Sequence, residues 1–177
     1  RVLKLYTDED SDSTRNWLPD KVVEMSKDKL WKNCEILYWI PVTRKDKIQV
    51  KSRSDRYLFI FYNAEQSDGF LLNISCRDKE IDFKKSWHLS DIKSVEFQEN
   101  SSMFKVSLEH DYVLNTASNI ERDEVIWVLI HVCKYLCSNE IKIKSMMGIK
   151  MLGLALSTNK TLSKFTILRK FLDENMD

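Results

Sequence analysis

A change of hydrophobic period near residue 118 constrains the fold of this chain more than any other feature. Before this point, 104–109 alternates apolar and polar residues, which is typical of a strand with one buried and one solvated face. After it, apolar residues recur at helical spacing over 119–137. Ser118 and Glu121 fit a capping box at the start of that segment. The sequence therefore predicts a strand-rich unit closed by one amphipathic helix.

Several earlier segments carry the aromatic and β-branched residues that favour strands. These segments are 34–40, 56–62 and 70–76, and a broken strand or bend is expected over 87–97. Together with the hairpin that follows, they predict six or seven antiparallel strands before the helix.

The turns between these segments give more local expectations. A turn at 67–69 precedes Phe70, Leu72 and Ile74, which we expect to share one inward face. His110 and Asp111 are predicted to form a two-residue hairpin link to 112–117, because His and Asp tolerate positive φ better than most residues.

The composition is that of one globular unit with extensions. The chain has 177 residues, of which 43% are hydrophobic and 31% charged, so it is long enough to bury a core. Only three glycines and two prolines are present, which excludes collagen-like repeats and Gly-rich dinucleotide-binding loops. No apolar run approaches the ~18–20 residues that a membrane-spanning helix needs.

The predicted order of elements is that of an α+β protein, in which a curved antiparallel sandwich or barrel is capped by a C-terminal helix. A single helix closes a curved sheet in this way in the pleckstrin-homology (PH) superfold, and other arrangements of strands followed by a helix remain open. We expect the PH-like domain to span 34–138. Helical extensions are expected on both sides, with a short helix near 17–30 inside 1–33 and a basic amphipathic segment over 139–177.

Catalytic and metal-binding motifs do not emerge from the sequence. His131, Cys133 and Cys137 could place three soft ligands near one helix, but their spacing favours a packed thiol and a surface imidazole. His88, Ser90 and Asp91 supply the residue types of a triad without a nucleophile elbow. We expect a protein that is not an enzyme, holds no cofactor or metal, and keeps its four cysteines reduced and mostly buried.

The most informative polar segment is a basic cluster over 44–56. It holds six cations and two acids, whereas the whole chain is nearly neutral with 28 basic and 27 acidic residues. Lys47, Lys51 and Arg53 share one side of an alternating run. Such a surface suits phosphates, which Arg binds bidentately and Lys as a point charge. The other interpretation is a solvated loop whose charges keep a sheet edge from aggregating.

A second basic segment lies over 141–170, where seven basic residues are interleaved with Met and Leu and no acid occurs. It could lie on a membrane as an amphipathic helix, pack on the domain as a second core helix, or begin a following domain. A nucleic-acid partner is not expected, since neither an aromatic stacking platform nor a recognition-helix pattern is evident.

Several runs of the sequence together resemble one known family. The run 85–96 has an aromatic residue, Leu, a further aliphatic residue, and Val followed by an acid. Similar matches continue in 56–60, 104–108, 116–118, 121–123 and 130–136. This pattern resembles the N-terminal PH-like domain of exocyst complex component 1 and its relative amisyn, over roughly 34–138. The PH-like domain of CARMIL-type actin-capping regulators shares parts of it.

The resemblance implies a membrane-targeting module in a vesicle-tethering subunit, cytoplasmic and peripheral at the plasma membrane. Its expected partners are phosphatidylinositol bisphosphate, a Rho-family GTPase and other tethering-complex subunits. By position in the loops, the residues implied in lipid contact are Arg44, Lys45, Lys47, Lys51, Arg53 and Arg56, with Lys84 and Lys85 in the next basic loop as secondary candidates. The alternative is a PH-fold interaction module without lipid specificity, which would dock a GTPase or scaffold through exposed apolar residues such as Trp39 or Trp127.

Overall fold

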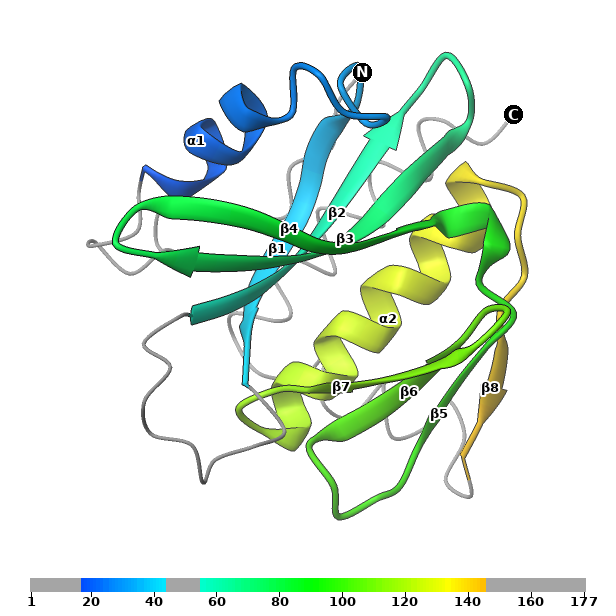
Figure 1. The fold of residues 1–177 in the computed structure, drawn as a ribbon. Coiled ribbons are helices and arrows are strands. Elements are labelled where there is room, and N and C mark those ends of the chain that lie inside the picture. The colour runs from blue at the N-terminus through cyan, green and yellow to red at the C-terminus, as the bar shows by residue number, and fades with distance from the viewer. Residues whose placement is uncertain (1–16, 44–54, 146–177) are drawn as a thin grey trace.

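The computed structural model describes residues 17–43 and 55–145, which form two stacked sheets and two α-helices (Figure 1). The first sheet has the order β1-β2-β3-β4 and is antiparallel throughout. Its strands are β1 (Glu35–Val42), β2 (Asp55–Asn63), β3 (Asp68–Arg77) and β4 (Glu80–His88). A short 3-10 turn, η2 (Leu89–Asp91), then leads into the second sheet.

The second sheet has the order β7-β6-β5-β8. Its strands are β5 (Ser94–Phe97), β6 (Met103–Ser107), β7 (Asp111–Asn115) and β8 (Lys142–Lys144), of which β8 runs parallel to β5. A bridge between Thr43 and Asn115 joins the end of β1 to the end of β7. The expected six to seven antiparallel strands and the α+β class are confirmed, and β8 is an addition that the sequence did not indicate.

Helix α2 (Asn119–Leu136) closes the two sheets, as the change of hydrophobic period predicts. Val125, Leu129 and Val132 are 0–1% exposed and lie in one core with residues of both sheets, which confirms the helix and its packing face. The capping box also forms. The Ser118 hydroxyl accepts a hydrogen bond from the Glu121 N–H at 3.2 Å, and the Glu121 carboxylate accepts one from the Ala117 N–H at 3.3 Å.

The expected polar face of α2 is wrong over its first half, where every residue from Arg122 to Ile130 is buried. The Glu124 carboxylate accepts a hydrogen bond from the Tyr38 hydroxyl of β1 at 2.6 Å. Charged residues are tolerated at such depth because each finds a hydrogen-bonding partner.

Arg122 is the largest side chain among the fully buried residues of the described structure, with 1% exposure. Its guanidinium pairs with Asp123 at 2.9 Å and lies 4.8 Å from the centre of the Phe97 ring. It also donates to the carbonyl oxygens of Gln98, Glu99 and Ser101 in the turn between β5 and β6. Arg122 thereby fastens the first turn of α2 to the second sheet.

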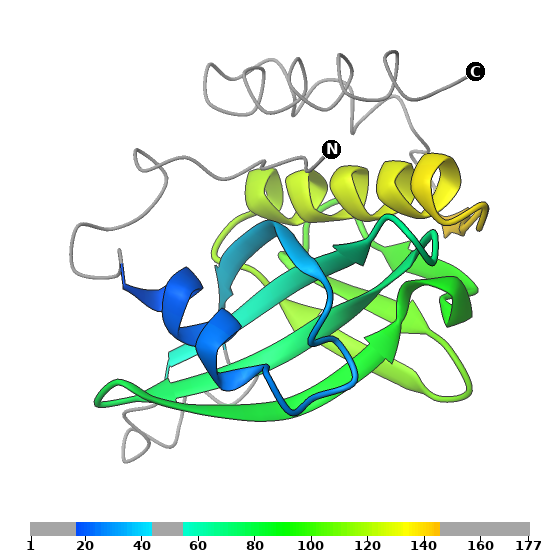
Figure 2. The same ribbon diagram turned by 90° about the horizontal axis from the view of Figure 1, so that it is seen from above.

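Helix α1 (Leu18–Met25) covers the outer face of the first sheet (Figure 2). Leu18, Val22 and Trp31 pack there in a second core with Phe70, Leu72 and Ile74. The last three residues share one buried face, as expected, but that face points to α1, whereas Leu71 points to the main core under α2.

The first sheet is therefore covered on both sides. The short helix expected near 17–30 is confirmed over Leu18–Met25, and Val23, Met25 and Leu30 are 47%, 40% and 81% exposed. None of the described helices is long and apolar enough to cross a bilayer.

Two turns differ from the sequence expectation. β6 and β7 are joined by a three-residue loop over 108–110, so Asp111 begins β7 and the two-residue link is wrong. The two-residue turn lies between β3 and β4, where Asp78 and Lys79 have φ of 50° and 66°. Positive φ at both central residues suits the twist of a hairpin, although Asn-Gly is the usual sequence for it.

Gly69 occupies the tightest backbone position in the first sheet. It lies opposite Tyr62 in the β2–β3 ladder and is buried. A Cβ atom at this position would overlap the carbonyl oxygen of Phe61 and lie 3.0 Å from the Cδ1 atom of Leu89. The hairpin therefore requires a residue without a side chain here.

The folded unit continues past residue 138, where we expected the PH-like domain to end. The Asn139 side chain donates to the carbonyl oxygens of Leu89 and Ile92, both at 2.9 Å. Ile141 is 5% exposed in the main core, and β8 then pairs with β5. The expected boundary thus falls inside the sandwich.

Candidate phosphoinositide-binding surface

The basic residues of the sequence cluster divide between the described structure and the rest of the chain. Arg44, Lys45, Lys47, Lys51 and Arg53 lie outside the described residues. Arg56 is described and stands near the start of β2, next to that segment. It lies opposite Val42 on β1 and Ser75 on β3.

Arg56 faces the concave side of the first sheet. Along β2, Leu58 and Ile60 belong to the main core and Tyr57 and Phe59 to the outer one, so the alternation of the strand places Arg56 with the first pair. A small cavity of about 130 Å³ adjoins it where Thr43 meets Asn115. Its lining residues are Val42, Thr43, Arg56, Asn73, Val113, Leu114 and Asn115.

Lys84 and Lys85 lie in the strand β4, so their expected place in a loop is wrong. The β3–β4 register shifts between Asn73, which pairs with Lys85, and Ile74, which pairs with Phe83. This irregularity leaves Lys84 as an extra residue in β4, as in a β-bulge. The side chains of two consecutive lysines can then lie on the same side of the strand.

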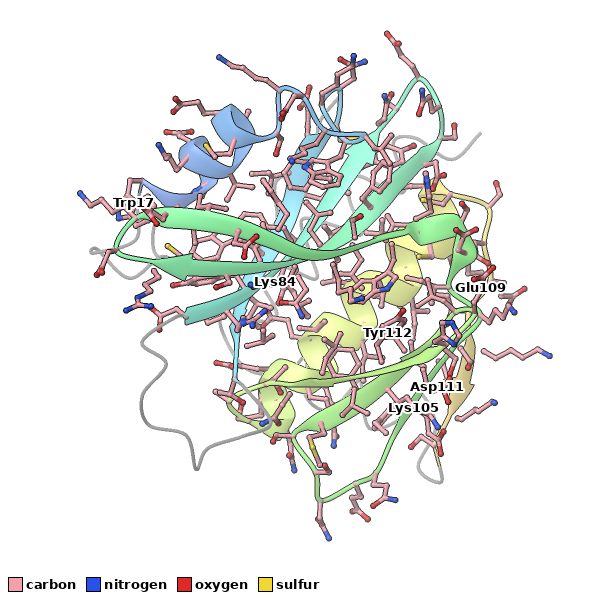
Figure 3. All side chains as sticks on the ribbon, in the orientation of Figure 1. Trp17, Lys84, Lys105, Glu109, Asp111 and Tyr112 are labelled. Carbon is pink, nitrogen blue, oxygen red and sulfur yellow. The ribbon has the colours of Figure 1, made fainter. Side chains whose placement is uncertain are left out.

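The contacts of the two lysines agree with this geometry. The Lys84 ammonium lies 2.6 Å from a carboxylate oxygen of Asp82, and both side chains are well exposed. The Lys85 ammonium lies 5.9 Å from the centre of the Tyr112 ring on β7. Figure 3 shows Lys84 and Tyr112 on β4 and β7, which are the facing edge strands of the two sheets.

The strand register brings these groups to one surface. Arg56 pairs with Ser75, and Ser75 pairs with Asp82, so all three side chains share the concave face. Neighbouring strands are roughly 4.8 Å apart, which places Arg56 and the Asp82–Lys84 pair about 10 Å from each other across β3. We name Arg56, Lys84 and Lys85 the cationic rim. Asp82 partly offsets its charge.

On the outer face of the second sheet, the described cation Lys105 is paired with carboxylates. Lys105 lies 2.9 Å from Glu96 and 3.6 Å from Asp111, and Figure 3 labels Lys105 and Asp111 on the second sheet. The Lys105 ammonium donates a hydrogen bond to the Glu96 carboxylate, and this bond and the negative charge of Glu96 raise the pKa of Lys105. A hydrogen bond from Ser107 lowers the pKa of Asp111. An open groove of about 1030 Å³ borders this face, but its lysines and acids compensate each other.

Residues considered above as zinc ligands make other contacts in the structure. The Cys133 thiol donates to the Leu89 carbonyl at 3.6 Å, and burial raises its pKa. His131 stacks on Trp127 with ring centres 4.1 Å apart. Burial also raises the pKa of Cys34 to about 11 and of Cys137 to about 12. These thiols are therefore protonated at neutral pH, and within the described ranges no group of three or more metal-ligating side chains forms.

Two sheets of mainly antiparallel strands closed by a C-terminal helix, with a basic segment between the first two strands, define this unit as a PH-like domain. Residues 51–135 match the family model described as the exocyst complex component SEC3 N-terminal PIP2 binding PH. This match confirms the resemblance seen in the sequence. No curated protein matches the chain.

The match begins inside the basic cluster and ends near the end of α2. It includes Lys51, Arg53 and the whole cationic rim, whereas Arg44, Lys45 and Lys47 precede it. Sequence reasoning missed Tyr112, which joins the rim only through the packing of β7 against β4.

Proposed function

We propose that this domain is a membrane-targeting module that binds phosphatidylinositol bisphosphate. The observation that carries the proposal is the match of 51–135 to a family described as PIP2-binding PH domains. The cationic rim supports it, because Arg56, Lys84 and Lys85 gather on the concave side of the first sheet, next to the segment that holds five further cations.

The proposed mechanism is electrostatic. Arg56 can bind a phosphate bidentately, and the lysines act as point charges around it. Each cation near an anionic leaflet contributes about 1 kcal/mol, so several must act together. Exposed charges are screened beyond about 8–10 Å at physiological salt, and binding should weaken steeply as salt is raised.

Reversing the charge of Lys47, Lys51 and Arg53 together to Glu should abolish sedimentation with vesicles that contain phosphatidylinositol bisphosphate. The reason is the change of six charge units at about 1 kcal/mol each. The melting temperature should stay nearly unchanged. The matched control is Lys142→Glu on β8, an exposed lysine of the second sheet. Unchanged sedimentation of the triple variant would remove the lipid assignment.

Replacing Asp82 with Asn should strengthen vesicle binding about fivefold, the equivalent of about 1 kcal/mol. The substitution removes a carboxylate that holds the Lys84 ammonium at 2.6 Å and opposes the charge of the rim. Asp111→Asn is the matched control, because Asp111 pairs with Lys105 on the outer face of the second sheet. Vesicle titrations at fixed salt measure both variants. Equal gains for both would show a general charge effect instead of a local one.

The finer expectations from the family resemblance belong to the same proposal. We propose that the module works by binding alone, in an exocyst subunit at the plasma membrane, and that a Rho-family GTPase and other subunits of that complex are further partners. The alternative that docks such partners through Trp39 or Trp127 is wrong in its residues, since these side chains are 6% and 5% exposed. Binding of a GTP-loaded but not a GDP-loaded Rho-family GTPase to the chain would support the GTPase.

A further inference from the structure

One tryptophan differs from the others in its surroundings. Trp31, Trp39, Trp87 and Trp127 are buried with 5–9% exposure, and the chain has five tryptophans in total. Trp17 is partly exposed and is the N-cap residue of α1. Figure 3 shows it beside the outer tip of the β3–β4 hairpin. An indole on the surface exposes a large apolar ring with a polar N–H.

Trp17 packs against the outer core and lies beside the hairpin tip. The Lys79 ammonium lies 5.8 Å from the centre of its ring. Lys79 belongs to the two-residue turn that follows Arg77, and Arg77 pairs with Glu80. Asp55, the first residue of β2, pairs with Cys76 just before that turn. The tip and Trp17 therefore lie at the end of the first sheet where β2 begins and β3 ends.

Charge alone gives this tip little attraction to a membrane. Arg77, Asp78, Lys79 and Glu80 cancel one another in formal charge. The indole is what the tip can offer a bilayer. Tryptophan concentrates at membrane–water interfaces because its ring is apolar and its N–H can remain hydrated. The long Lys79 side chain can lie along the ring and keep its ammonium among phosphates.

We propose that Trp17 is an interfacial anchor that inserts among the headgroups of an anionic membrane, while the neighbouring Lys79 ammonium binds phosphates. This inference rests on the proposed lipid binding and adds an apolar contact to it. The proposed binding partner is then the bilayer itself as well as a single headgroup.

Tryptophan fluorescence of the full chain tests the anchor directly. On adding vesicles of phosphatidylcholine, phosphatidylserine and phosphatidylinositol bisphosphate, we expect a blue shift and quenching by brominated acyl chains. Both changes should vanish in Trp17→Phe, because the remaining tryptophans are buried. In sedimentation, Trp17→Ala should bind these vesicles about tenfold more weakly, as loss of a modest apolar contact implies.

Two controls separate the anchor from the phosphate contacts. Soluble inositol 1,4,5-trisphosphate should bind Trp17→Ala and the wild type equally in calorimetry. Leu30→Ala removes an 81% exposed apolar side chain between α1 and β1 and should leave vesicle binding unchanged. If the wild type binds vesicles without a spectral change, and Trp17→Ala binds equally, the anchor is wrong and the lipid proposal stands. If the wild type does not bind at all, both are wrong.

Discussion

Replacing Arg122 with Met is expected to lower the free energy of unfolding by about 3–5 kcal/mol, the cost of breaking a buried ion pair by removing one partner. The Asp123 carboxylate is 2.9 Å from the guanidinium and equally buried, so it would lose its counter-charge. The carbonyl oxygens of Gln98, Glu99 and Ser101 would lose a donor at the same time. Methionine fills much of the volume, which isolates the polar loss from a cavity.

Urea unfolding followed by circular dichroism measures this change. Arg77→Met is the matched control, because Arg77 is exposed at the end of β3 and should cost less than about 0.5 kcal/mol. Burial raises the pKa of Asp123, so its carboxylate already carries a desolvation cost in the native protein. A loss below about 1 kcal/mol in Arg122→Met would show that the network contributes little to stability.

Replacing Gly69 with Ala is the second large effect, with an expected loss of at least about 3 kcal/mol or failure to fold. The added Cβ would overlap the Phe61 carbonyl oxygen, which is backbone inside the β2–β3 ladder and cannot move alone. Leu89 restricts the other side. The ladder between the two strands would have to separate locally.

Thermal melting and one-dimensional NMR check this prediction. Ser86→Ala, at an exposed position of the neighbouring β4, is the control and should melt within a few degrees of the wild type. A Gly69→Ala protein with the wild-type melting temperature would mean that the hairpin rearranges at no cost. That outcome would contradict the close approach of the two backbones.

The strands and α2 could be predicted from the sequence, but where both faces of a strand are buried the sequence does not show which face meets which core. The second half of the chain follows its hydrophobic period closely, from the alternation of Phe104 and Val106 to the spacing of α2. In the first sheet both faces are buried, so periodicity alone does not indicate which side of β3 meets the main core. The outer core also depends on α1, and the short apolar pattern of α1 does not indicate that this helix covers the sheet.

Only part of the candidate site could be predicted from the sequence. A cluster of cations between two predicted strands is visible in the sequence, and Arg56 is the member of that cluster that the structure describes. The resemblance implies a loop for Lys84 and Lys85, whereas both lie in β4 next to a register irregularity. Their neighbours Asp82 and Tyr112 depend on pairing and on sheet packing, which no local sequence pattern encodes.

The parallel pairing of β8 with β5 has a practical meaning for handling this domain. A shortened version that stops at residue 138 would lack Ile141 and would uncover one side of β5. Uncovered strand borders invite pairing between molecules. Such a fragment would tend to self-associate. Aggregated protein sediments without lipid, and this would be mistaken for membrane binding.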